Sequence, residues 1–148
     1  MIVKGMKITA PKDIFEAVKP WRKKPQENFL TVTLNGAHEV IKVHHVTKGT
    51  VNKTIVHPRE CYRPALFDNA SAVAFVHNHP SGQLEPSEED QRVTKDLGMA
   101  AQILGLNMLD HLIISKNGFY SIIGNVRHNT FSSHELEAFS KKCVYGEG

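Results

Sequence analysis

The chain has little cysteine, only a small excess of positive charge, and no long apolar run. Its two cysteines, Cys61 and Cys143, form no CxxC pair, which argues against a disulfide scaffold and favours a reducing compartment. No apolar stretch approaches the ~20 residues that span a bilayer. The opening MIVKGMKITA has too short an apolar part for a signal peptide. We therefore expect a cytoplasmic protein without membrane association.

The remaining composition is that of an ordinary globular domain. The chain has 148 residues, 41% of them hydrophobic, so it is long enough to bury a core as one domain. It contains no internal repeat and no low-complexity segment. The net charge of +3 permits contact with nucleic acid but does not argue for it.

Hydrophobic patterns divide the chain into three parts. Residues 1–28 are expected to form a short helix at Pro11–Val18 and a basic linker. Residues 29–124 are expected to form the main domain, and residues 125–148 a polar tail that is helical. Within the main domain, strands alternate with helices, which predicts an α/β fold with a mixed sheet flanked by helices.

Individual elements of the main domain have clear signals. Asn35-Gly36 lies between two strand-like runs and predicts a hairpin, and Asn117-Gly118 predicts a second one. The nearly continuous apolar run SAVAFVH, residues 71–77, predicts a buried central strand. Apolar residues recur at three- and four-residue spacing from Ser87 to Leu104, which predicts an amphipathic helix.

Two histidines one residue apart, His77 and His79, follow the predicted central strand. In an extended strand, alternate residues point to the same side with Cα atoms about 6–7 Å apart. Two imidazoles at that spacing can converge on one ion that lies about 2 Å from each nitrogen. A lone H-x-H motif is also common on ordinary strand surfaces, so further donors are needed to decide between the two interpretations.

Asp90 is well placed to supply a third donor. The stretch SEED, residues 87–90, has the form of a capping box in which Ser87 is the N-cap and Asp90 stands three positions later. Turn-forming residues between His79 and Asp90 allow the chain to fold back from strand to helix. Helix capping alone also explains this motif, and spacing by itself supports a metal site and a routine helix start equally.

The full string HNHPSG followed by S-x-x-D, with ten residues between His79 and Asp90, resembles the JAMM motif of the MPN metalloprotease superfamily. More closely, the chain resembles the RadC family of bacterial JAMM proteins, without the N-terminal helix-hairpin-helix domain of full-length relatives. Further stretches carry the same resemblance: GTVNKTIVHPRE at 49–60 and LGLNMLDHLIIS at 104–115. The resemblance implies the MPN/JAMM fold, which is similar to that of cytidine deaminases.

The resemblance also implies a set of roles. His77, His79 and Asp90 would bind one zinc ion per chain, and a water molecule would fill the fourth position. Ser87 would hold that water or steady the oxyanion. Three protein ligands with one open position are typical of catalytic zinc, which lowers the pKa of its bound water to about 7. The implied function is a zinc-dependent hydrolase of peptide or isopeptide-like amides, and related domains often form dimers.

The base glutamate of JAMM enzymes is expected five positions before the glycine of the Gly49-Thr50 pair, where this chain has His44. Glu39 lies about 16 Å further along the same predicted strand and on its opposite face. Glu60 lies on the following helix, so neither acid is a convincing replacement.

His44 then has three interpretations: a general base, a fourth ligand that closes the site, or a strand histidine without metal contact. A register shift of one would bring in His45 instead.

These observations leave three candidate functions. The first is the zinc hydrolase. The second is a catalytically degenerate MPN module that binds a partner, supported by the missing acid at position 44. The third is an accessory role in DNA repair, suggested by the family name alone. One further histidine, His111 in MLDHLI, is expected to stabilise the sheet through a hydrogen bond rather than to bind metal.

Overall fold

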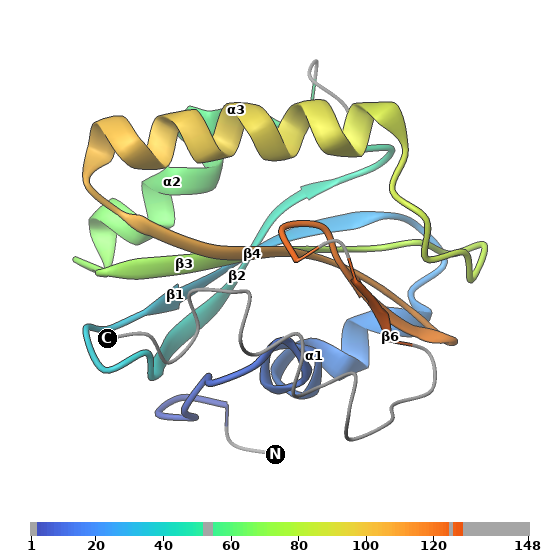
Figure 1. Cartoon of the computed structure of the whole chain (residues 1–148), viewed down its shortest axis with the longest axis horizontal. Helices are drawn as coiled ribbons and strands as arrows, with labels where there is room; N and C mark the ends of the chain where they lie inside the picture. Colours follow the sequence, from blue (N-terminus) through green and yellow to red (C-terminus); the bar gives the residue numbers. More distant parts are fainter. Residues whose placement is uncertain (1–2, 52–54, 125, 129–148) are drawn as a thin grey trace.

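The computed structural model describes residues 3–51, 55–124 and 126–128, and within them one mixed sheet is flanked by helices (Figure 1). The strand order is β2-β1-β3-β4-β5-β6. This arrangement confirms the α/β fold with a mixed sheet that the sequence predicts. The elements are α1 (Pro11–Val18), the 3-10 helix η1 (Lys19–Lys23), β1 (Asn28–Leu34), β2 (Val40–Lys48), α2 (Pro58–Phe67), β3 (Ala72–Asn78), α3 (Glu88–Leu104), β4 (Asn107–Ser115), β5 (Gly118–Ser121) and β6 (Val126–His128).

Strand pairing follows the local signals closely. The Asn35-Gly36 and Asn117-Gly118 turns join antiparallel pairs β1–β2 and β4–β5, so both predicted hairpins are confirmed. Strand β3 is buried along its whole length between β1 and β4, as its apolar run predicts. Strands β3 and β4 are parallel, and α3 makes the crossover between them. A parallel pair needs such a crossover, because the chain must return to the same end of the sheet.

Both ends of helix α3 are fixed by local capping interactions that can be recognised in the sequence. At its start the Ser87 hydroxyl accepts from the Asp90 N–H and the Asp90 carboxylate accepts from the Ser87 N–H, which completes the predicted capping box. At its end, Gly105 adopts a left-handed conformation with φ of 71° and donates its N–H to the Ala101 carbonyl.

Two apolar clusters lie on opposite faces of the sheet. Helices α2 and α3 cover one face, and α1 covers the other (Figure 1). The α1 side chains Ile14, Phe15 and Val18 are buried in the same cluster as residues of β1, β3 and β4. The sequence predicts a short helix and a basic linker before residue 29, and this helix, α1, packs on the sheet of the main domain. The reason is the strongly amphipathic pattern of this short helix, which places its apolar side on the sheet.

The polar tail falls mostly outside the described residues. Of residues 125–148, the structure describes 126–128, which pair with β5 as strand β6. The helix expected in the rest of the tail is therefore untested. Among the described residues, no helix combines the length and the apolar character needed to cross a membrane.

Candidate metal centre

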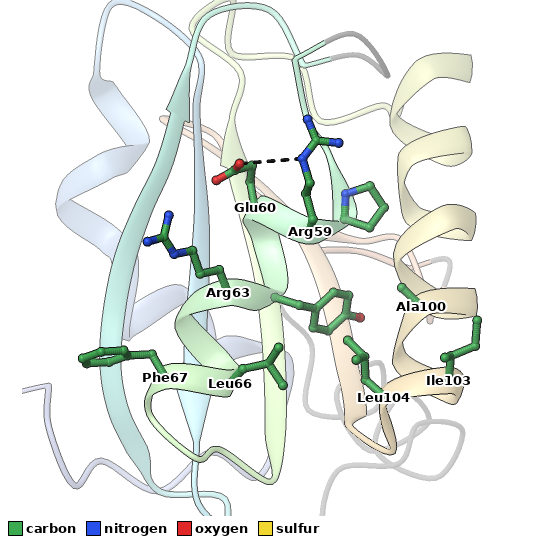
Figure 2. Close-up of a pocket in the computed structure, with 10 residues that line it drawn as sticks. Arg59, Glu60, Arg63, Leu66, Phe67, Ala100, Ile103 and Leu104 are labelled. Carbon is green, nitrogen blue, oxygen red and sulfur yellow. Dashed lines mark ion pairs between the residues drawn. The ribbon is translucent and has the colours of Figure 1, made fainter.

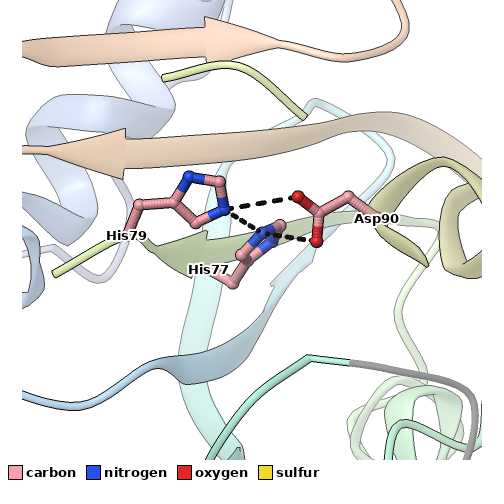
Figure 3. A group of neighbouring side chains, drawn as sticks. All are labelled: His77, His79 and Asp90. Carbon is pink, nitrogen blue, oxygen red and sulfur yellow. Dashed lines mark hydrogen bonds and ion pairs between the residues drawn. The ribbon is translucent and has the colours of Figure 1, made fainter. Parts of the chain in front are cut away.

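Three side chains converge where β3 ends and α3 begins (Figure 3). His77 is the penultimate residue of β3, His79 follows that strand by one position, and Asp90 lies in the first turn of α3. The two imidazole Nε2 atoms are 3.2 Å apart. The Asp90 Oδ1 atom lies 3.1 Å from His77 Nε2, and Oδ2 lies 3.3 Å from His79 Nε2. The three residues predicted from spacing therefore do come together in one group compatible with a metal ion.

The turn between the two histidines and the aspartate is anchored to the neighbouring hairpin. The backbone carbonyl of Gly82 accepts hydrogen bonds from the Ser115 hydroxyl and the Asn117 side-chain amide, at 3.0 and 2.9 Å. Gly82 has φ of 89°, and a Cβ at this position would lie 2.9 Å from Asn117 Nδ2. Only glycine fits such a backbone conformation and close contact at once. The turn is thereby held against the sheet, which fixes where His79 points.

A hydrogen bond at Nδ1 determines which of the two ring nitrogens of His79 carries the proton. His79 Nδ1 lies 3.0 Å from the backbone carbonyl oxygen of Gln83. Since a carbonyl oxygen can only accept, Nδ1 must donate its hydrogen to it. In the neutral imidazole this leaves an unshared electron pair on Nε2, which faces Asp90.

The protonated nitrogen of His77 follows from the hydrogen bonds of Thr94 and His111. The Thr94 hydroxyl donates its single proton to the Asp90 backbone carbonyl at 2.7 Å, so its oxygen accepts from His111 Nδ1 at 2.5 Å. His111 Nε2 must then accept from His77 Nδ1, at 2.8 Å. His77 Nε2 is left with an electron pair directed at Asp90. The hydrogen bond expected of His111 is therefore present, and its partner is a candidate ligand.

The burial and the charge of the three side chains also favour a bound cation. His77 and Asp90 are 0% and 2% exposed and the His79 side chain is 12% exposed, so two nitrogen electron pairs and a carboxylate face one another largely away from solvent. Burial alone would raise the pKa of the Asp90 carboxyl, but positive charge on the adjacent His77 and His79, together with the hydrogen bond from the Ser87 N–H, holds that pKa well below its usual range when no ion is bound. Burial likewise would lower the pKa of His79, but the contact with Asp90 outweighs it and raises that pKa. Two imidazoles and one carboxylate are a donor set suited to zinc.

The imidazole of His111 stays uncharged. Complete burial is the main reason that its pKa lies well below the usual value, and the nearby His77 adds to the effect. A neutral His111 can accept a hydrogen bond at Nε2, as the arrangement with His77 requires. Such outer-shell partners orient metal-binding histidines and fix their tautomer.

A glutamate outside the predicted set lies beside the three side chains. Glu27 lines the same surface hollow, of about 640 Å³, as His79, Ser87 and Asp90. Its charge is close enough to contribute to the raised pKa of His79. Its Oε2 atom accepts a hydrogen bond of 2.7 Å from the Val51 N–H, which holds the carboxylate in place. Glu27 escaped prediction because position 27 was assigned to a linker. An acid directly before the apolar strand FLTVTL is the signal that could have found it.

His44 is not in this group. Its Nε2 atom lies 2.6 Å from Asp68 Oδ2, at the end of α2, and Thr33 donates to the same carboxylate oxygen. His44 lines a different hollow, together with Glu60 and Arg63. Of its three interpretations, the structure agrees with the strand histidine that makes no contact with the candidate ligands. The physical reason is register: β2 places Thr47, not His44, opposite Phe29, which in turn pairs with His77.

Ser87 lies at the exposed edge of the hollow that contains Glu27. Its Oγ atom accepts from the Asp90 N–H at 3.0 Å. This bond uses the oxygen as acceptor and leaves the hydroxyl proton to be donated elsewhere. The residue is therefore a helix cap whose hydroxyl also borders the hollow.

We predict that His111→Phe weakens zinc binding by about 10- to 100-fold, the range typical for loss of an outer-shell partner. Phenylalanine keeps the ring but leaves His77 Nδ1 without an acceptor. Zinc affinity measured by competition with a chromogenic chelator checks this result. Thr94→Ser is the matched control, because it keeps the hydroxyl that His111 donates to. An affinity unchanged in His111→Phe would show that His77 does not depend on this hydrogen bond.

The chain is similar in sequence to a known protein family. The family model described as RadC-like JAB domain matches residues 8–128. A UPF0758 protein of Methanospirillum hungatei is 46% identical over 119 residues, and one of Trichlorobacter lovleyi is 40% identical over 118 residues. The matches cover 79% of this chain and 53% and 51% of the two relatives, so the chain spans about half of their length. A UPF0758 protein of Staphylococcus aureus is 45% identical, with 80% and 55% covered.

The matched range, residues 8–128, covers most of the chain and contains the positions of the three converging side chains, Glu27 and His111. It begins before α1, in agreement with the packing of that helix on the sheet. The chain belongs to the RadC family, with a RadC-like JAB domain that holds a candidate metal site at its strand-to-helix junction.

Proposed function

We propose that the protein is a zinc-dependent hydrolase of the JAMM type that cleaves a peptide or isopeptide-like amide. One observation carries the proposal. Two histidine electron pairs and a carboxylate converge beside a hollow that also contains a second carboxylate, Glu27. Metal-assisted amide hydrolysis needs this combination of an ion-binding group and a separate proton acceptor.

His77, His79 and Asp90 would hold the ion. Their donor set provides three ligands, and the adjacent hollow opens to solvent, which leaves room for substrate at a fourth position. A bound zinc ion supplies Lewis acidity that activates water and polarises a carbonyl group. Zinc is proposed because two imidazoles and a carboxylate match its preferences.

Glu27 and Ser87 would move protons and stabilise charge. The Glu27 carboxylate accepts a proton from the attacking water as the new C–O bond forms. It then returns that proton to the leaving nitrogen as the C–N bond breaks. The Ser87 hydroxyl, whose oxygen already accepts from Asp90, donates to the carbonyl oxygen while it is negatively charged. Each role uses an atom that borders the same hollow.

The presence of Glu27 also weakens the alternative of a catalytically degenerate binding module. That alternative depended on the lack of an acid at position 44. Glu27, the residue before β1, lines the same hollow as His79 and Asp90 and would supply a carboxylate in place of one from β2.

Metal analysis combined with an amide-cleavage assay tests the proposal. We expect about one zinc per chain, and we expect cleavage of a peptide or isopeptide library that stops with a chelator and resumes with added zinc. His77→Ala should lose both the metal and the cleavage. His38→Ala, a histidine in the β1–β2 turn, is the matched control and should lose neither. Protein that purifies without stoichiometric metal and does not bind added zinc would contradict the proposal.

A further inference from the structure

Strand β2 is an edge of the sheet, and most of its outer side has no neighbouring strand among the described residues. Its first residue, Val40, is covered, because Val40 donates its N–H to the Met6 carbonyl and accepts from the Gly5 N–H. From Ile41 to Lys48 the described part of the chain adds no further strand on that side. The outward-facing N–H and C=O groups of such an edge are available to pair with another strand.

A hollow borders this edge on the face of the sheet that α1 covers. Its volume is about 470 Å³. It is lined mainly by apolar side chains, among them Pro20 and Trp21 from the segment after α1 and Ile41 and Val43 from β2. Trp21 and Val43 are only partly buried where they pack against the core. The hollow can therefore take up an apolar side chain that arrives from outside the domain.

The hollow that contains His44 borders the same edge on the face that α2 covers. Its volume is about 390 Å³, and the exposed side chains of Lys42 and Arg63 line it. Glu60 also lines it and forms an ion pair of 3.9 Å with Arg59. Figure 2 shows this pair, and it shows the Arg63 side chain on the flank of α2 that is turned away from α3. Lys42 and Arg63 can therefore attract a negatively charged side chain at this edge.

The charge along the edge also distinguishes between possible partners. Lys48, at the end of β2, and Lys4, beside the apolar hollow, add two further exposed positive side chains. A second copy that paired through its own β2 would bring these like charges together, which is unfavourable. An acidic segment would instead meet charges of opposite sign. The edge therefore fits an acidic chain of a different protein better than it fits a copy of itself.

We propose that β2 docks an extended acidic segment of a partner protein by strand addition to its free edge. In this mode, main-chain hydrogen bonds provide affinity, and pockets for alternate side chains provide specificity. The side chains of an added strand point alternately to the two faces of the sheet. One set would enter the apolar hollow beside Trp21, and the other would reach Lys42 and Arg63. The recognised segment therefore alternates apolar and acidic residues.

This docking edge is separate from the candidate metal centre. Strand β1 lies between β2 and β3, the strand that carries His77. The hollows at the edge contain none of the three candidate ligands. The test below measures binding rather than cleavage, so the docking proposal can fail or succeed whether or not the protein is a hydrolase.

A synthetic peptide of about eight residues that alternates valine and glutamate tests the proposal, since this is a usual strand length. Titrated into the isotope-labelled full chain, it should shift the backbone amide signals of residues 41–46 in NMR spectra and give a Kd of about 1 mM or tighter. The same peptide with lysine in place of glutamate should bind about 10-fold more weakly. A version methylated at every backbone nitrogen should not bind, because it cannot donate hydrogen bonds to the edge.

Charge reversal on the protein provides the matched variants. Lys42→Glu and Arg63→Glu should each raise the Kd of the glutamate peptide by about 10-fold and tighten binding of the lysine peptide, because attraction and repulsion are exchanged. Both side chains are exposed, so the fold should be kept. Lys95→Glu is the control, because Lys95 is an exposed lysine of α3 that lines neither hollow. It should bind both peptides like the parent chain.

Three results would overturn the proposal. The first is the lack of saturable shifts at peptide concentrations well above about 1 mM. The second is equal binding of the methylated peptide, or shifts confined to another surface, because strand addition to β2 would then not be the mode of binding. The third is a set of β2 shifts that depend on protein concentration without any peptide, because a second copy would then occupy the edge.

Discussion

Glu27→Gln is expected to reduce the rate of amide cleavage by about 10² to 10⁴-fold, the contribution typical of a general base. A glutamine side chain has nearly the same shape and cannot accept the proton. Its carbonyl oxygen can still accept from the Val51 N–H, so the local structure should be kept. Zinc content should stay near one per chain, because Glu27 is not among the three converging ligands. Rate and metal content measured on the same preparation check this result.

His44→Gln is the control that separates the two candidate bases. His44 bonds to Asp68 and lines a separate hollow, so its replacement should leave the cleavage rate within a few-fold of the parent. The opposite pattern, with cleavage kept in Glu27→Gln and lost in His44→Gln, would show that His44 on β2 is the general base instead.

Asp90→Asn should weaken zinc binding by more than about 100-fold, beyond the range typical of an outer-shell partner. The substituted side chain would lack the negative charge and would place an amide nitrogen near one of the two Nε2 atoms. Its remaining oxygen can still accept from the Ser87 N–H, so the helix start should survive. Isothermal titration with zinc measures the loss, and thermal unfolding of the metal-free protein measures the helix.

Asp90→Ala separates ligation from capping. Alanine removes the charge and also the carboxylate that accepts from the Ser87 N–H, so the metal-free protein should lose about 1 kcal/mol, the net value of one hydrogen bond, that the asparagine variant retains. Zinc affinity should be equally poor in both variants. If Asp90→Asn bound zinc as tightly as the parent, the carboxylate would not be a ligand and the proposed set of three ligands would be wrong.

Features of the chain that depend on neighbouring residues were predictable from sequence. The bounds of α3 follow from its capping box and its C-terminal glycine, both of which act within one turn of helix. The two hairpins follow from Asn-Gly turns in the same way. His77 lies at the end of β3 and His79 directly after it, where the two-residue repeat of an extended chain directs both to one side. These rules involve only residues close in sequence and need no tertiary contact.

The remaining parts of the site depend on long-range pairing. Glu27 comes to line the same hollow as His79 and Asp90 because β1 lies antiparallel to β3, with Phe29 opposite His77. His111 reaches His77 because β4 lies parallel to β3 on the other side. No spacing rule connects positions 27, 77 and 111, since strand order decides which of them meet. His44 lies outside the candidate metal site for the same kind of reason, because a bulge in β2 shifts the register of this strand against β1.

All three candidate ligands come from one short stretch of chain, residues 77 to 90, and this has a thermodynamic consequence. A denatured chain keeps these donors near one another, because closing such a small loop costs little entropy. The denatured state should therefore retain part of the affinity for zinc. Binding to the native state alone would add about 2.7 kcal/mol of stability at free zinc one hundred times Kd. The ion should consequently protect this domain against unfolding by less than its native affinity suggests.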